Sequence, residues 1–498
     1  MIAERGAALD RLFDELLGAP DWSRRPGVVY ALVAGDEVVH ERAYGLAHLD
    51  FALPISAGTR FPIASITKTF AAMLATMLAH EGKLDLDAPA RAYLPELHPF
   101  EPPVRVRHLL SMTSGIREEY GLAMMASGEA YGPRTCAQTR GLILAQTTQN
   151  FPAGRDVLYC NSNYSLLHGI LESVGGADFG ELLRVRIFAP LGLHDTAFEA
   201  NFRPGKREAA GYELEGERWR PFDHRIEMSA SGGIVSTLRD LQAWHRNVRR
   251  NLLEPRDLFE RLTAPLTLDS GRRSDYALGI QVQRYAGRTV VGHSGGIGPY
   301  ASEYLFFRDD DFAVVLLANQ NETNWYERAR ELGLAWLDPD AEAPTRPRRG
   351  TALWSADYGD LAYGRAYRVE RVPGGLRLED RVFHETPERE FIKPNAVQRE
   401  KIFALDRNDD GPPQALAYDD GNRRVELRCA AFAPETSELD TYVGTYRSND
   451  IPGAHRIWRE GGRLLLHVGD GFPPGRIVAL APVVPDLFRA LDPDDGKP

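Results

Sequence analysis

The sequence predicts an α+β fold, in which a large domain of helices packed on an antiparallel sheet is followed by two small antiparallel β-barrel domains. Strand-like runs lie near both ends of residues 1–340, and helical patterns dominate between them. Residues 341–350 are rich in proline and charged side chains, which is typical of a linker. Beyond them the helical period disappears, and short alternating segments with glycine turns take over.

The elements of the large domain can be followed in order. Residues 28–33 and 37–44 form a hairpin around Ala34-Gly35-Asp36, and helical patterns run from residue 63 to about 193. Strands return after about residue 275, and a last helix covers residues 325–337. Because the first strands are expected to pair with the late ones, an active site is expected where the sheet meets the helical insert.

The rest of the chain is predicted to form two barrels, over residues 351–433 and 436–498. The second segment is short for eight strands of about five residues with their turns. Whether the last barrel is complete is therefore left open.

Composition limits the function classes. A net charge of -11 argues against nucleic-acid binding and against an anionic membrane surface. The chain contains no run of 18 apolar residues and no signal-like start, so we expect a cytoplasmic protein. Its three cysteines are widely separated, which does not suggest a disulfide framework. The histidines lack metal-ligand spacing, so neither a metal nor a cofactor is predicted.

Ser65 and Lys68 stand one helical turn apart at the start of an apolar-periodic helix. A buried helix would present both side chains at one place, where a neutral lysine can take the proton of the serine hydroxyl. The helix start also offers a free backbone N–H to an oxyanion. Alone, the pair equally fits an N-capping serine beside a solvated lysine.

Tyr159 and Asn161 lie on a loop that leads from the turn at 151–154 into a helical pattern. A tyrosine hydroxyl can pass a proton between nucleophile and leaving group, and an asparagine amide can hold a substrate carbonyl. The ordinary alternative is a turn tyrosine before an N-capping asparagine. Cys160, between them, is expected to be a small free residue without a nucleophilic role.

His293, Gly295 and Gly296 belong to a His-Ser-Gly-Gly run after the strand-like residues 288–291. Small residues there let a substrate backbone approach a strand edge, and the N–H of Gly296 is expected to be the second oxyanion donor. The run also fits Gly-x-Ser-x-Gly, the nucleophile elbow of α/β-hydrolases, with Ser294 as the nucleophile. An elbow needs a helix directly after the serine, whereas a strand-like pattern follows, so Ser65 is favoured.

The ordered motifs Ser65-x-x-Lys68, Tyr159-x-Asn161 and His293-x-Gly295 resemble those of the serine β-lactamase and penicillin-binding-protein superfamily. Histidine in place of the usual Lys-Thr-Gly lysine, together with Tyr-Cys-Asn, is similar to the D-aminopeptidase branch. That resemblance implies a β-lactamase-like catalytic domain and two C-terminal barrels. It also implies that a loop of the last barrel reaches the active site. Here the candidate is the hairpin 469–475, which carries Asp470, and the alternative is an ordinary surface turn.

These expectations combine into one mechanism. Ser65 attacks a carbonyl carbon, Lys68 and Tyr159 share its proton in an order left open, and an acyl-enzyme forms. Asn161 is expected to hold the substrate's amide, and His293 either tunes the Lys68–Tyr159 pair or contacts a substrate carboxylate or carbonyl. The expected activity is a D-stereospecific aminopeptidase acting on short peptides, amides or esters. The alternatives are an esterase, a weak β-lactamase, a penicillin-binding-protein-type cyclase or thioesterase and, least favoured, a non-catalytic binding module; a homodimer is left open.

Overall fold

The computed structural model divides the chain into two compact units, each considered by itself below. The first comprises Met1–Ile116, Pro133–Arg140 and Phe151–Glu342, and the second Arg117–Gly132, Gly141–Asn150 and Ala343–Pro498. The residues that the structure describes are 2–18, 20–339, 354–360, 365–372, 375–379, 381–385, 391–392, 401–404, 412–419, 424–429, 436–448, 450–451, 453–460, 463–468, 477–484 and 487–491. The predicted domain limits at 340, 350 and 433 stay predictions.

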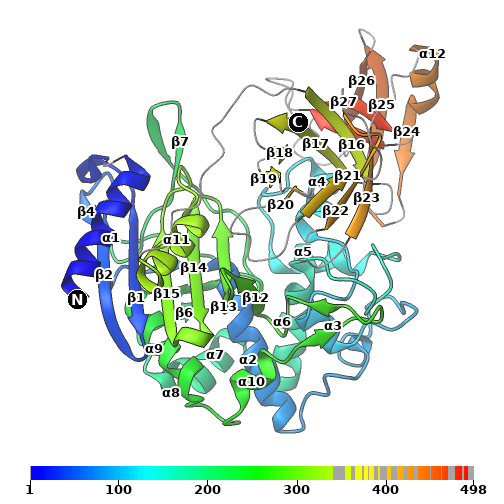
Figure 1. Cartoon of the computed structure of the whole chain (residues 1–498). Coiled ribbons are helices and arrows are strands. Elements are labelled where there is room, and N and C mark those ends of the chain that lie inside the picture. Colours follow the sequence, from blue (N-terminus) through cyan, green and yellow to red (C-terminus); the bar gives the residue numbers. More distant parts are fainter. Residues whose placement is uncertain are drawn as a thin grey trace. The chain divides into compact units, whose positions relative to one another are not determined.

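A six-stranded antiparallel sheet forms the centre of the first unit (Figure 1). In spatial order its strands are β12 (Gln281–Tyr285), β13 (Arg288–Ile297), β14 (Tyr300–Phe307), β15 (Phe312–Ala318), β1 (Val28–Ala34) and β2 (Glu37–Tyr44). β1 pairs with β15 from Val28 opposite Ala318 to Ala34 opposite Phe312. The expected hairpin and the pairing of first with late strands are therefore confirmed.

Helices cover both faces of this sheet. α1 (Ile2–Leu17) and α11 (Trp325–Leu337) contact each other and cover one face, where the Phe13 ring lies 5.2 Å from that of Tyr30. On the other face, α9 (Leu238–Arg250) places Trp244 4.5 Å from the ring of Tyr304. The remaining helices of this unit are α2 (Thr67–His80), α3 (Val106–Leu110), α6 (Ser162–Gly175), α7 (Phe179–Leu183), α8 (Ala189–Leu191) and α10 (Leu258–Leu262), and α5 (Cys136–Leu144) crosses the division between the units.

Short strands complete the first unit, and one group of them positions the site. β5 (Phe61–Pro62), β9 (Ile234–Ser236) and β6 (Ala197–Phe198) form a small sheet in that order. The others pair in twos, and they are β3 (Leu46–His48) with β4 (Leu53–Pro54), β7 (Tyr212–Glu215) with β8 (Arg218–Pro221), and β10 (Leu266–Thr267) with β11 (Arg273–Ser274).

In the second unit a closed antiparallel barrel surrounds a core that includes Tyr358, Val369, Phe383 and Leu427. Its strands are β16 (Trp354–Asp360), β17 (Arg365–Val372), β18 (Gly375–Leu378), β19 (Arg381–Glu385), β20 (Phe391–Ile392), β21 (Lys401–Ala404), β22 (Ala415–Asp419) and β23 (Arg424–Cys429). Alternating apolar residues at the centre of these strands supply that core.

The last described segment of the second unit is a five-stranded antiparallel sheet. It contains β24 (Gly444–Arg447), β25 (Ala454–Glu460), β26 (Arg463–His467), β27 (Ile477–Val484) and β28 (Leu487–Leu491), and α12 (Thr436–Leu439) precedes it. α4 (Glu119–Ser127) belongs to the same unit. The side chain of Asp450 accepts hydrogen bonds from the backbone N–H and the hydroxyl of Thr147, at 3.1 and 2.8 Å, which ties this sheet to the 141–150 segment. The prediction of a second barrel stays a prediction.

Two findings concern the whole described chain. None of its described helices combines the length and apolar character that a membrane-spanning segment needs. Nor do its described residues bring three or more His, Cys, Asp or Glu side chains together as a metal site would.

Candidate active site

Ser65 lies on a tight turn between the small sheet and α2. A 3₁₀ turn over Ala64–Ile66 follows β5 and leads directly into α2, so the regular helix begins two residues later than expected. Ile63 donates its N–H to Ile234 O at 2.9 Å, which fixes the turn to β9. Ala64 has φ +43°, a left-handed conformation that costs an L-residue about 1 kcal/mol and that is common beside functional groups. The turn is therefore held by its surroundings rather than by local preference.

The apolar stripe of α2 is buried, as its spacing predicts, and the structure also buries the other sides of this helix from Thr67 to Leu78. Phe70, Met73, Leu74, Met77 and Leu78 are all buried. Lys68 is also fully buried, although it is charged at neutral pH when unperturbed. A buried ammonium group requires hydrogen-bond acceptors, and those acceptors define the site.

Hydrogen-bond acceptors surround the Lys68 amine. Nζ lies 3.0 Å from Ser65 Oγ, 2.8 Å from Asn161 Oδ1 and 2.6 Å from the carbonyl oxygen of Ser231. The first two residues were expected from their motifs. Ser231 was not, because it contributes a backbone oxygen and no spacing connects it with Lys68. This arrangement holds Nζ where it can exchange a proton with the serine oxygen.

Tyr159 completes the group around Lys68. Its loop enters α6, and the ring centroid lies 5.1 Å from Lys68 Nζ, within cation–π range. The side chain is 40 % exposed, so it remains accessible from solvent. Asn161 occupies the N-cap position of α6 and turns its Oδ1 atom towards Lys68. Its NH₂ group is the donor that the sequence assigned to a substrate carbonyl.

His293 is buried, with both ring nitrogens in hydrogen bonds. Nδ1 lies 2.6 Å from Ser294 O, and since a carbonyl only accepts, Nδ1 carries the proton. Nε2 therefore accepts from the hydroxyl of Tyr276 at 3.0 Å. Burial, with a smaller contribution from the Lys68 charge, lowers the pKa of His293 to about 3, so the ring is neutral at neutral pH. Tyr276 was missed, because nothing in its sequence surroundings links it to the third motif.

Gly295 permits a close approach between β13 and the nucleophile turn. A Cβ atom at this position would lie 2.2 Å from Ile63 O and 2.2 Å from Ser302 Oγ. Ser302 donates to the same carbonyl oxygen at 2.8 Å, so β13, β14 and the turn form one rigid contact. At Gly296 a Cβ atom would lie 2.5 Å from the hydroxyl oxygen of Tyr326 on α11. Glycine is required at position 295, where the close atom is a backbone oxygen, whereas at position 296 a side chain would have to displace the end of the Tyr326 ring.

The same segment of β13 has an open edge. β12 pairs with Arg288–Gly292, whereas β14 pairs with Val290–Ile297. Within the described strands, residues 293–297 therefore have a partner strand on one side only, and the other side faces the catalytic group. An extended substrate backbone can add at such an edge.

Ser294 points away from Ser65, because successive side chains of a strand face opposite sides. Its hydroxyl donates to Glu303 Oε1 at 2.9 Å, on the face covered by α11. The residues after it continue through β13 into β14 and form no helix. The expected exclusion of a nucleophile elbow is confirmed by this topology.

Asp470 and the hairpin 469–475 lie outside the described residues. Their predicted part in substrate binding stays a prediction. All the other candidate residues (Ser65, Lys68, Tyr159, Asn161, His293, Gly295 and Gly296) lie in the first unit.

Comparison with known proteins agrees with this architecture. The family model described as Beta-lactamase matches residues 9–335. A D-aminopeptidase of Cereibacter sphaeroides is 30 % identical, covering 97 % of this chain and 90 % of the relative. A D-aminopeptidase of Gluconobacter oxydans is 27 % identical, covering 94 % and 89 %. The octameric penicillin-binding protein homologue from Pyrococcus abyssi has a TM-score of 0.60 at 20 % identity, covering 93 % of this chain and 98 % of that structure. The chain belongs to the beta-lactamase family.

Proposed function

We propose that this protein is a serine hydrolase that works through an acyl-enzyme, and that it is a D-stereospecific aminopeptidase or amidase for short peptides, amides and esters. The observation that carries the chemistry is the position of Lys68 Nζ, 3.0 Å from Ser65 Oγ and 2.8 Å from Asn161 Oδ1 in a buried setting. The substrate class rests on the D-aminopeptidase relatives, which match this chain over nearly its full length.

In the proposed reaction Ser65 Oγ bonds to the carbonyl carbon while its proton passes to the Lys68–Tyr159 pair. The backbone N–H groups of Ser65 and Gly296 stabilise the oxyanion. The C–N bond then breaks, and the departing amine takes a proton from Tyr159. Water attacks the acyl-enzyme, returns a proton to the pair and restores the serine hydroxyl. Lys68 and Tyr159 act as a pair, and either can be the immediate base.

The geometry favours an indirect role for His293. Both of its nitrogens are occupied by Ser294 O and Tyr276, so it acts through Tyr276 and the Lys68–Tyr159 pair rather than by touching the substrate. Tyr159 lies 6.1 Å from the rings of both Tyr276 and His293, and these side chains restrict the position of its ring.

The proposed aminopeptidase specificity needs a negative charge for the substrate ammonium, and Asp470 is the proposed source of that charge. The loop that carries it would be part of the second barrel proposed for residues 436–498. A substrate whose amine is blocked would then bind more poorly than one with a free amine. An esterase would not distinguish blocked from free substrates.

The test compares Ser65→Ala with Ser294→Ala, since Ser294 lies in the competing motif but on the opposite face of β13. Turnover of D-aminoacyl nitroanilides is expected to fall at least ~1,000-fold in the first variant and to stay within about tenfold in the second. An active-site serine probe is expected to label the wild type and Ser294→Ala only. Labelling that is lost in Ser294→Ala and kept in Ser65→Ala would reverse the assignment. The assignment would change from aminopeptidase to esterase if D- and L-aminoacyl nitroanilides were turned over equally. Turnover of N-blocked esters at the same rate as substrates with a free amine would change it in the same way.

A further inference from the structure

Two residues that flank Ser65 bond to the same backbone unit of β9. Ile63, two residues before the serine, donates its N–H to Ile234 O at 2.9 Å. Thr67, two residues after the serine, uses its Oγ1 atom to accept the N–H of Ile234 at 3.0 Å. Both backbone polar groups of Ile234 therefore bond to the nucleophile segment, one on each side of Ser65.

Ile234 lies three residues after the carbonyl that accepts from Lys68. The distance from Lys68 Nζ to Ser231 O is 2.6 Å, shorter than those to Ser65 Oγ and Asn161 Oδ1. Residue 232, between Ser231 and Ile234, packs on the same turn, since a Cβ atom there would lie 3.7 Å from the backbone of Ala64. The place of the Ser231 carbonyl beside Lys68 therefore depends on how residues 231–234 are seated on the nucleophile turn.

Thr67 is the side chain that holds this segment. It is the first residue of α2 and is fully buried, and the mechanism described above does not use it. Because a backbone N–H only donates, Thr67 Oγ1 is the acceptor in the bond to Ile234. A valine has nearly the same shape but lacks this acceptor, so it would leave the buried N–H of Ile234 without the Thr67 bond.

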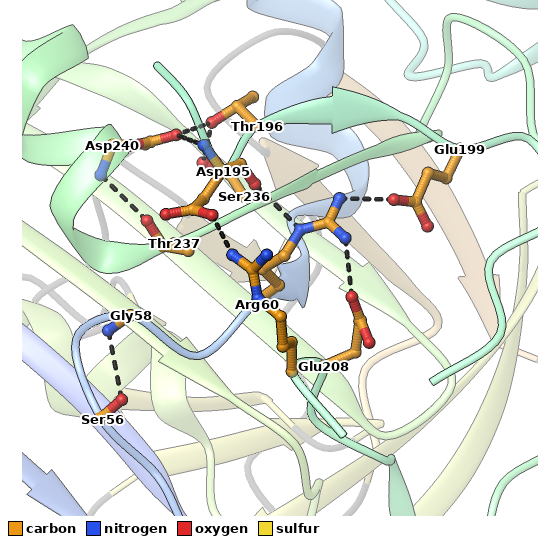
Figure 2. Close-up of polar contacts among 11 residues, drawn as sticks. Ser56, Gly58, Arg60, Asp195, Thr196, Glu199, Glu208, Ser236, Thr237 and Asp240 are labelled. Atoms are coloured by element: carbon orange, nitrogen blue, oxygen red, sulfur yellow. Dashed lines mark hydrogen bonds and ion pairs between the residues drawn. The ribbon is translucent and has the colours of Figure 1, made fainter. Parts of the chain in front are cut away.

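The far ends of β5 and β9 are fixed by other contacts. Figure 2 shows Thr196 between Ser236, the last residue of β9, and Asp240, with distances of 2.8 Å to Ser236 Oγ and 2.7 Å to Asp240 Oδ2. Arg60, which precedes β5, donates to Glu208 Oε1 at 2.7 Å. Loss of the Thr67 bond is therefore expected to release the 231–234 end of the segment while the sheet keeps its place.

Ser229 holds the Ser231 carbonyl from the other direction along the chain. Its Oγ atom accepts the N–H of Ser231 at 3.2 Å and donates to Ser231 Oγ at 3.0 Å. The N–H groups of Gly232 and Gly233 both donate to Ser229 O at 3.1 Å. The carbonyl thus sits in a tight turn that is fastened by Ser229 before it and by Thr67 after it.

We propose that Thr67 is a positioning residue for the reaction: by holding Ile234 it keeps the Ser231 carbonyl against Lys68 Nζ and so directs the amine towards Ser65 Oγ. The inference rests on the proposed acyl-enzyme function and adds a residue to it. When the carbonyl shifts, Nζ loses a fixed partner and its alignment with the serine oxygen, and proton transfer slows. Substrate binding does not involve this contact, so the effect belongs to kcat rather than KM.

The test compares Thr67→Val with Thr67→Ser, using D-alanyl p-nitroanilide as the substrate. Thr67→Val is expected to lower kcat at least ~10-fold and to leave KM within about threefold, because a small misplacement of the amine affects only the chemical step. Thr67→Ser keeps the acceptor, so its kcat should stay within about threefold of the wild type. Thr76→Val is the matched control with the same expectation, because Thr76 is a buried threonine of the same helix whose hydroxyl donates to Ala72 O at 2.8 Å.

Two further measurements make the test independent of one variant and of one substrate. Ser229→Ala reaches the same carbonyl from its other side, and it should also lower kcat at least ~10-fold with KM retained. The rate constant for labelling by the active-site serine probe reports on Ser65 without a substrate side chain, and it should fall by a similar factor in Thr67→Val and Ser229→Ala.

An unchanged kcat and labelling rate in folded Thr67→Val or folded Ser229→Ala would overturn the inference. So would a loss that Thr67→Ser does not restore, or an equal loss in Thr76→Val. In each of these cases Ser65-dependent turnover by the wild type leaves the proposed function intact. Absence of both Ser65-dependent turnover and Ser65-dependent labelling in the wild type would instead overturn the proposed function, and the inference with it.

Discussion

Glu303 is a buried acid beneath the catalytic strand, and its removal should stabilise the protein at alkaline pH. The residue is 1 % exposed, pairs across the strands with Ser294, and accepts one hydrogen bond from that hydroxyl at 2.9 Å. Its Oε2 atom is buried without a hydrogen-bond partner among the described residues. Burial raises the pKa of Glu303 from 4.5 to about 7, although the nearby Arg330 charge opposes the shift.

The sign and size of the effect follow from these two pKa values. Below pH 4.5 the acid is protonated in both the folded and the unfolded chain, so it does not alter stability. Between pH 4.5 and 7 the unfolded chain loses its proton first, so the free energy of unfolding decreases as the pH rises. A difference of about 2.5 pKa units corresponds to about 3 kcal/mol, reached in full above pH 7.

Glu303→Gln removes this dependence, because an amide resembles the protonated acid at every pH. The stability difference between variant and wild type is therefore expected to shift by about 3 kcal/mol in favour of the variant between pH 4.5 and pH 8. Denaturant unfolding at both pH values measures this stability difference. Unfolding of the first unit is detected as the loss of labelling by the active-site serine probe. Glu217→Gln, at an exposed turn, is the matched control. A stability difference that is the same at both pH values would refute the argument that burial raises the pKa of Glu303.

Three other predictions concern activity. Tyr159→Phe should lower kcat at least ~100-fold, as expected for loss of a general acid–base group, while Cys160→Ser should stay within a few-fold; thiol-blocking reagents that inactivate the Cys160→Ser protein would show that another sulfur matters. Gly295→Ala should lower turnover at least ~100-fold with the fold retained by circular dichroism, because the new Cβ meets Ile63 O at 2.2 Å; near-normal kcat would show that the turn can yield. Deleting residues 469–475 should weaken aminopeptidase activity and admit N-blocked or bulkier acyl substrates, and an unchanged substrate profile in a folded deletion would exclude that loop as the specificity element.

The parts of the site that could be predicted are those whose geometry is local. Ser65 and Lys68 are three residues apart on one helical segment, so their spacing alone brings the side chains together. Joining them to Asn161 required the resemblance of the ordered motifs to a known superfamily. The contacts that escaped prediction, such as that between Tyr276 and His293, depend on tertiary packing and leave no period or spacing in the sequence.

The end of β13 was harder to predict for a different reason. The apolar pattern stops at Val291, yet the strand continues to Ile297. Glycine weakens a strand signal, but here it is required because the backbone of β13 approaches Ile63 too closely for a side chain. Sequence patterns record side-chain burial, whereas this segment is held by contacts of its backbone.

The neutral His293 has a consequence for the proposed substrates. Most members of the superfamily that the motifs resemble have a lysine in the third motif, which would add a second ammonium near Lys68. An aminopeptidase substrate brings its own ammonium close to the reacting carbonyl, and a second ammonium in the same site would repel it. A histidine whose pKa is about 3 carries no charge at neutral pH and avoids this repulsion, while its Nε2 atom still holds Tyr276 at 3.0 Å. The substitution in the third motif is therefore consistent with a cationic acyl residue and disfavours an anionic substrate such as a β-lactam carboxylate.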